Sequence, residues 1–311
     1  MVLAVLNIAS DAVVVMTAGV AAFIFIHKSI SLPLFAVKNS VALAMPYYYI
    51  RICLCDTRRQ KYITERQEKN KMSLFAISDL HLSIGSGPGK SMEVFGSRWT
   101  DYMSKLEKNW RAVITKDDSV VIAGDISWAL RLEEAREDLL FLDSLPGTKY
   151  IGKGNHDFWW STGAKMKKLF DDNGISTIKI LYNNAYKIDD RIICGSRGWF
   201  TDKALQKTVG EVEYDKIINR ETVRLRLALD EAVKLRGDTE TEILVFLHFP
   251  PVYREFSCPG IIELLHEYGI RRCFYGHIHG SYTIPRSFDC EGIEMIMTAA
   301  DFLDFAALPV S

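Results

Sequence analysis

The chain has 311 residues, of which 48% are hydrophobic and 25% charged, with 38 basic against 39 acidic side chains. These averages are those of a globular protein and exclude a wholly disordered or fibrous chain. These averages conceal a change in net charge near residue 71. Residues 1–71 hold nine basic and four acidic side chains, whereas the remainder holds 29 basic and 35 acidic ones. The acidic remainder has no extended basic surface for nucleic acid and is long enough for one α/β domain with a full core.

Residues 1–71 begin with a long apolar segment. Residues 12–26 carry no charged side chain, and extension back to Val2 gives a run close to the roughly 20 residues of a membrane helix. Asp11 would then lie within the span, at a cost of about 2.5–3.5 kcal/mol near the centre of a helix. A second apolar stretch over 32–55 contains two prolines and a lysine and is a weaker candidate. The tyrosines and basic residues that follow would place the rest of the chain on the cytoplasmic side.

An alternative interpretation is that residues 1–71 do not belong to the native protein. Met72 is followed at once by Ser-Leu-Phe-Ala-Ile-Ser-Asp, which indicates a first strand directly behind an initiator. Gln67-Glu68 can be encoded by a purine-rich string that resembles a bacterial ribosome-binding site. Membrane attachment is therefore expected only if residues 1–55 are genuine, with domain 72–311 facing the cytoplasm. The six cysteines form no C-x-x-C pair, which favours a reduced, cytoplasmic setting.

From residue 74 onward, short apolar runs alternate with helical patterns, which is typical of an α/β domain. The expected strands cover 74–78, 120–123, 149–152, 177–181, 185–188, 191–194, 243–247, 272–275 and 293–298. The expected helices cover 99–114, 133–142, 163–171 and much of 211–236. One apolar stripe of the last helix is expected in the core, formed by Ile217, Ile218, Val223, Leu225, Leu229 and Val233. The adjacent strands around Asp189-Asp190 predict a hairpin and hence a mixed sheet.

Polar side chains follow five of these strands at the point where each strand ends. The blocks are Asp79-Leu80-His81, Gly124-Asp125, Gly154-Asn155-His156-Asp157, His248 and Gly276-His277-Ile278-His279-Gly280. Each block alone is weak evidence, since a Gly-Asp pair is usually a turn and a single histidine is usually structural. Their joint order at strand ends, where open α/β sheets bind ligands, indicates one shared site. An Asp/His/Asn set without thiolates suits Mn, Fe or Zn and argues against a closed structural zinc site.

The ordered pattern D-x-H, G-D, G-N-H-[D/E], H, G-H-x-H resembles that of the calcineurin-like metallophosphoesterases over residues 74 to about 300. The amino-acid sequences of segments 73–82, 154–160 and 194–200 are similar to those of bacterial predicted phosphohydrolases in that superfamily. The resemblance implies an α/β fold, a β-sandwich of two mixed sheets flanked by helices. Residues 1–71 would form an apolar and then basic N-terminal extension before the domain 72–311.

The resemblance also implies two divalent metal ions bridged by one carboxylate. The first ion would be held by Asp79, His81, Asp125 and His279. The second would be held by Asp125, Asn155, His248 and His277. A hydroxide between the ions would attack phosphorus directly, because metal binding lowers the pKa of water. His156, oriented by Asp157, would stabilise the transition state or protonate the leaving oxygen.

Arg197 is a candidate for bidentate contact with a substrate phosphate, and a surface ion pair is the alternative. Trp159, Trp160 and Trp199 are candidates for an aromatic wall, with packing as the alternative. We expect a phosphoesterase that acts on phosphomono- or phosphodiesters of a small molecule. The alternative is a metal-binding scaffold or assembly subunit with vestigial catalysis. Phosphoprotein phosphatases and lipid-A precursor pyrophosphatases are disfavoured, because D-R-G does not follow Gly124 and His156 stands where the latter have arginine.

Overall fold

The computed structural model describes residues 4–9, 12–17, 20–22, 72–85, 92–199, 211–254 and 256–311. The chain divides into two compact units, Met1–Asn70 and Lys71–Ser311. In the first unit, three antiparallel strands form a small sheet: β1 (Ala4–Ala9), β2 (Ala12–Thr17) and β3 (Val20–Ala22).

The described part of the apolar segment 12–26 thus forms strands and not the membrane helix that its hydropathy suggested. The β-branched run of β2 explains the difference, since consecutive valines favour extended backbone. Within the described parts of the chain, no helix is both long and apolar enough to cross a membrane. The second apolar stretch, 32–55, and the residues just before Met72 lie outside the described residues.

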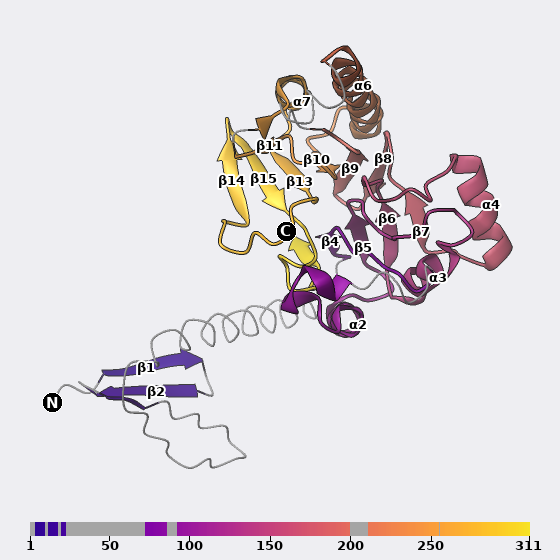
Figure 1. The fold of residues 1–311 in the computed structure, drawn as a ribbon. Coiled ribbons are helices and arrows are strands. Elements are labelled where there is room, and N and C mark those ends of the chain that lie inside the picture. Colours follow the sequence, from indigo (N-terminus) through magenta and orange to yellow (C-terminus); the bar gives the residue numbers. More distant parts are fainter. Residues whose placement is uncertain are drawn as a thin grey trace. The chain divides into compact units, whose positions relative to one another are not determined.

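Two mixed sheets form the second unit, as expected (Figure 1). The six-stranded sheet has the order β14-β15-β13-β10-β9-β8. Its strands are β8 (Asn184–Ile188), β9 (Arg191–Ser196), β10 (Glu242–Leu247), β13 (Arg272–Tyr275), β14 (Ser287–Cys290) and β15 (Ile293–Met297). The five-stranded sheet has the order β16-β4-β5-β6-β7. Its strands are β4 (Leu74–Ile77), β5 (Ser119–Ile122), β6 (Thr148–Ile151), β7 (Ile178–Ile180) and β16 (Leu308–Val310). In both sheets the inner strands pair in parallel, so their carboxyl ends share an edge.

Helices flank the sheets (Figure 1). They are η1 (Met92–Phe95), η2 (Ser97–Trp99), α2 (Tyr102–Val113), α3 (Arg136–Ser144), α4 (Gly163–Asn173), α6 (Glu211–Arg236) and α7 (Pro259–Glu267). A short hairpin joins β11 (Val252–Tyr253) and β12 (Phe256–Ser257). The helix expected over 99–114 begins later than predicted, because Asp101 has a φ of 52°, which interrupts the helical backbone. The sequence did not indicate α7, β14 or β16, which are short.

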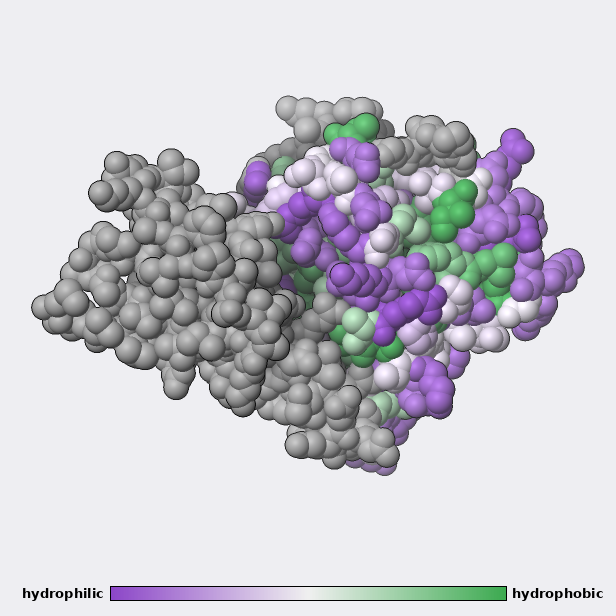
Figure 2. All heavy atoms as spheres, turned by 90° about the horizontal axis from the view of Figure 1, so that it is seen from below, coloured by the Kyte–Doolittle hydropathy of each residue, from purple (hydrophilic) through white to green (hydrophobic). Residues whose placement is uncertain are grey.

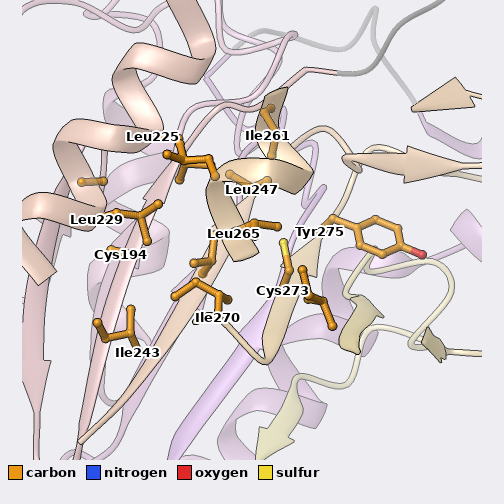
Figure 3. Packing of buried hydrophobic residues seen from close by; sticks show 14 of the residues in the cluster. Cys194, Leu225, Leu229, Ile243, Leu247, Ile261, Leu265, Ile270, Cys273 and Tyr275 are labelled. Carbon is orange, nitrogen blue, oxygen red and sulfur yellow. The ribbon is translucent and has the colours of Figure 1, made fainter. Parts of the chain in front are cut away.

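Alternate side chains along the strands of the six-stranded sheet point to opposite faces and contribute to two separate hydrophobic cores. Ile193, Leu244 and Phe246 face the five-stranded sheet and form the centre of the sandwich. Their neighbours in sequence point to the opposite face, where they pack beneath α6 and α7 (Figure 3). Leu225 and Leu229 of α6 are buried in this second core as predicted. Val223 is 59% exposed, so its place in the predicted stripe was wrong, and buried alanines of α6 complete the apolar face instead. On the face shown in Figure 2, hydrophilic side chains surround smaller apolar patches.

Candidate metal centre

All seven candidate ligands lie just beyond strand ends, and the structure brings them together. In chain order they are Asp79, His81, Asp125, Asn155, His248, His277 and His279. Four of the seven have a φ between 47° and 70°, namely Asp79, His81, Asp125 and His277. Non-glycine residues seldom adopt this left-handed conformation, and such strain is concentrated at functional sites. The backbone therefore bends sharply at these four residues, and their side chains point toward a common site.

Glycines beside the ligands are required by close packing. A Cβ atom at Gly154 would lie 2.0 Å from Oδ1 of Asp125, and one at Gly276 would lie 2.4 Å from Oδ2 of Asp79. A side chain at either position would displace a carboxylate of the site. The glycines of the G-N-H and G-H-x-H blocks thus keep space for the ligands of neighbouring strands.

A first group of donor atoms converges around His279. Its Nε2 lies 3.1 Å from Nε2 of His81 and 3.3 Å from Oδ1 of Asp79. Nε2 of His81 lies 3.7 Å from Oδ2 of Asp125. These spacings allow one ion to contact Asp79, His81 and His279 together.

A second group converges around Asn155. Its Oδ1 lies 2.7 Å from Nε2 of His248 and 3.0 Å from Nδ1 of His277. Nε2 of His248 lies 3.5 Å from Oδ2 of Asp125. Asp79 also lies within reach of an ion held by Asp125 and His248, so its carboxylate faces both groups, whereas sequence reasoning assigned it to the first alone.

The carboxylate of Asp125 is also shared by the two groups, and its geometry fits a bridging role. Oδ2 of Asp125 is buried, faces a histidine from each group, and has no hydrogen-bond partner among the described residues. The other carboxylate oxygen, Oδ1, accepts the backbone N–H of His156 at 2.8 Å. A buried carboxylate oxygen without a partner is costly, and a cation between the two groups would satisfy it. The donor set therefore fits divalent metal.

Electrostatics support the same conclusion. Burial lowers the pKa of His248 to about 3 and that of His277 to about 4, and it lowers the pKa of His81 well below its usual value. These imidazoles are therefore neutral near pH 7, as metal ligands must be. Burial, followed by the charges of Asp157 and Asp79, raises the pKa of Asp125 well above its usual value.

His279 differs from the other imidazoles. Burial acts to lower its pKa, but the charge of Asp79 and hydrogen bonds to Asp301 and Asp79 outweigh burial and raise the pKa to about 10. Burial likewise opposes ionisation of Asp79, yet the charge and hydrogen bond of His279 outweigh it and lower the pKa of that carboxyl. In the bare protein, His279 thus carries a proton at a place where a metal cation would compete with it.

His156 lies beside the first group, half-buried. Its ring centroid is 4.5 Å from that of Trp128 and 5.5 Å from that of His81. Trp128 also stacks on His81 at 4.8 Å, and this contact was missed because nothing in the sequence marks a tryptophan three residues beyond Asp125. The imidazole of His156 is therefore held between aromatic side chains at the margin of the candidate metal centre.

Asp157 has a different role from the one expected. Its carboxylate accepts the backbone N–H groups of Asp125, Ile126 and Gly154 at 2.8–2.9 Å and that of Ser127 at 3.3 Å. Nε1 of Trp159 donates a fifth hydrogen bond at 2.9 Å. These bonds join the second and third blocks, so the geometry corrects the expectation that Asp157 orients the His156 ring.

The remaining candidates lie around the margin. Nη2 of Arg197 lies 3.0 Å from Oε1 of Glu221, so it forms a largely buried ion pair and not the surface pair considered from sequence. Trp159 is buried and Trp160 packs on Tyr182, which favours packing for both. Asp301, which follows β15, also contacts the site through His279 and was not among the residues expected from the sequence.

Known proteins provide a comparison with this geometry. A sequence model of the calcineurin-like phosphoesterase family matches residues 72–281. No curated relative matches the sequence. A phosphopantetheinyl hydrolase from Mycobacterium tuberculosis is 16% identical over 77% of this chain and 96% of that chain, with a TM-score of 0.48. A protein of unknown function from Aquifex aeolicus is 15% identical over 77% and 96%, with a TM-score of 0.40.

Proposed function

We propose, from the premise that this chain belongs to the calcineurin-like phosphoesterase family, that its metal centre holds two ions and hydrolyses phosphomono- or phosphodiesters of a small molecule. Membership makes the chain a metal-dependent phosphoester hydrolase. The observation that carries the two-ion proposal is the unpaired Oδ2 of Asp125, which faces His81 on one side and His248 on the other.

Each group of ligands would bind one of the two ions. The first ion would be held by Asp79, His81, Asp125 and His279, and the second by Asp125, Asn155, His248 and His277. Bound divalent ions such as Mn, Fe or Zn polarise phosphoryl oxygens and lower the pKa of water. The buried carboxylates and neutral imidazoles are complementary to such cations, because they supply oxygen and nitrogen donors of borderline hardness.

The side chains around the metal centre would act on the substrate. The imidazole of His156, half-buried against Trp128 and His81, would stabilise the transition state or deliver a proton to the leaving oxygen. Asp157 supports catalysis indirectly, since its carboxylate fixes the loops that carry Asp125 and His156. Arg197 would contact the substrate from the margin.

A reduced, cytoplasmic setting is part of the proposal. Among the described residues, Cys194, Cys258, Cys273 and Cys290 are free thiols, which supports this setting.

Metal reconstitution tests the function. Protein stripped with a chelator is reloaded with Mn, Fe or Zn, its metal content is measured, and hydrolysis of 4-nitrophenyl phosphate and bis(4-nitrophenyl) phosphate is followed. We expect two ions per chain and turnover of at least one ester. One ion at saturation would refute the dinuclear centre, and two bound ions with neither ester hydrolysed would refute the proposed reaction.

A further inference from the structure

Three arginines surround one buried carboxylate on α6. Glu221 is fully buried, and its Oε1 lies 2.7 Å from Nη1 of Arg224, 3.0 Å from Nη2 of Arg197 and 3.6 Å from Nε of Arg220. One negative charge therefore faces three positive ones. A partly buried excess of positive charge is unfavourable without a counter-anion, and it is notable in a unit whose sequence is acidic overall.

The cluster lies beside the metal centre. Arg197 directly follows β9, and its carbonyl oxygen accepts the backbone N–H of His248 at 3.0 Å. Trp199 packs on Phe249 with ring centroids 4.7 Å apart, and Phe249 packs on His277 at 4.4 Å. The arginines are thus connected to two candidate ligands of the second ion by one backbone hydrogen bond and by two successive ring contacts.

Two further loops reach the same place. Lys153 follows β6 and lies two residues before Asn155, and it interacts electrostatically with Arg197, Arg224 and Glu221. Tyr182 follows β7, and its ring lies 5.8 Å from Cζ of Arg224. These loops leave the carboxyl ends of their strands, as the metal ligands do, so the cluster is on the ligand-binding edge of the sandwich.

Donors within this cluster lack partners. Nε of Arg197 and Nε1 of Trp199 are buried, and neither has a hydrogen-bond partner in the described part of the chain. Oε2 of Glu221 is also unpaired, so the three arginines share one carboxylate oxygen and retain N–H groups that it does not satisfy. Buried N–H groups without partners are rare in native proteins. An anion at this cluster would supply acceptor oxygens and balance the excess positive charge.

We propose that Arg197 and Arg224, held in place by Glu221, bind a second phosphate group of the substrate. This inference rests on the proposed function, because the two proposed metal ions would neutralise the phosphoryl group that is cleaved. The substrate is then a small molecule with at least two phosphate groups, one in the metal centre and one against the arginines. Guanidinium groups suit this role, since their planar forks match phosphate oxygens bidentately.

Anion binding to metal-free protein tests the cluster without any catalytic readout. Chelator-treated protein is titrated with inorganic pyrophosphate in a calorimeter. We expect one site, weakened about 10-fold or more in Arg224→Gln, because hydrogen bonds between charged groups contribute roughly that much to affinity. Arg226→Gln is the matched control, since Arg226 lies on the same helix and pairs with the exposed Glu267 at 2.6 Å. Thermal melting verifies that each variant is folded, and Arg224→Lys, which keeps the charge but loses the planar fork, replaces Arg224→Gln if the latter does not fold.

Selectivity tests the substrate class. The Mn-loaded protein is assayed on propane-1,3-diol bisphosphate and on propyl phosphate. The wild type should prefer the bisphosphate in kcat/KM by about 10-fold, and Arg224→Gln should abolish this preference while Arg226→Gln keeps it. Equal kcat/KM for the two esters, or pyrophosphate binding that is equal in wild type and Arg224→Gln, overturns the inference and leaves the proposed hydrolysis intact. Specific pyrophosphate binding without turnover of any ester would instead uphold the anion site and refute the proposed reaction.

Discussion

Oδ1 of Asp301 lies 3.1 Å from Nδ1 of His279, while Nε2 of the same ring lies 3.3 Å from Asp79. Asp301 is fully buried, and its second oxygen accepts the N–H of Gly280 and the hydroxyl of Tyr282, both at 3.0 Å. A carboxylate on the far nitrogen of a ligating histidine fixes the ring and raises its basicity as a ligand. Asp301 thus orients one candidate ligand of the first ion.

Asp301→Asn should weaken binding of the first ion by about 10- to 100-fold, as loss of such outer partners does. Competition with a chelating dye measures the affinity. Tyr282→Phe removes only one hydroxyl bond to Asp301 and should have a smaller effect. An unchanged affinity in Asp301→Asn would show that His279 needs no orienting partner.

Asp125→Ala should remove both ions, because its Oδ2 faces both ligand groups. Asn155→Ala is the comparison, since Asn155 contacts the two histidines of the second group and its loss should leave about one ion per chain. Elemental analysis after dialysis counts the ions. Retention of one ion in Asp125→Ala would exclude a bridging carboxylate at this position.

His156→Ala should keep both ions and lower kcat by about 10²- to 10⁴-fold, the usual contribution of a proton-transferring side chain. The backbone N–H that donates to Asp125 is retained in this variant, so the metal centre should keep its geometry. Metal content and kcat are measured on the same sample. If kcat is unaltered, His156 transfers no proton in the rate-limiting step.

Asp157→Asn should destabilise the fold by at least about 2 kcal/mol, because one of its two acceptor atoms becomes a donor that faces buried N–H groups. Denaturant unfolding gives the free energy. Asp117→Asn is a suitable control, as Asp117 is exposed and pairs with its neighbour Lys116. Equal stability of Asp157→Asn and wild type would mean that the five hydrogen bonds are dispensable.

Lys149 should make stability depend on alkaline pH. Its buried Nζ lies near the carbonyl oxygens of Leu145 and Gly147, and burial lowers its pKa from 10.5 to about 8. Between these two values the unfolded chain holds the proton and the folded chain does not, so the free energy of unfolding rises with pH. The penalty of the buried charge is present below pH 8 and disappears towards pH 10.5.

Lys149→Met removes this titration. Denaturant unfolding at several pH values should show that the free energy of wild type, relative to the variant, increases from about pH 8 to about pH 10.5. A constant difference across this range would contradict a lowered pKa at Lys149.

From the sequence alone, most strands, the α/β class and the residues that meet at the candidate metal centre could be predicted. Periodicity reveals which strands are buried, and parallel strands must end at one edge, so Asp79, Asp125 and His248 could be expected together. Val223 and Asp301 show what could not be predicted from the sequence. A period of 3.6 residues does not reveal where the edge of a buried stripe falls, and a carboxylate after a strand is not marked as a partner of His279, 22 residues away.

The way in which the polar side chains share their contacts is visible only in the folded structure. Asp157 stands beside His156 in sequence, yet its oxygens are taken by backbone N–H groups from two loops. The arginines around Glu221 come from the loop after β9 and from α6, and nothing in their spacing predicts that they share one carboxylate. Hydrogen bonds and charges act through short distances in space, so their partners follow from packing and not from position along the chain.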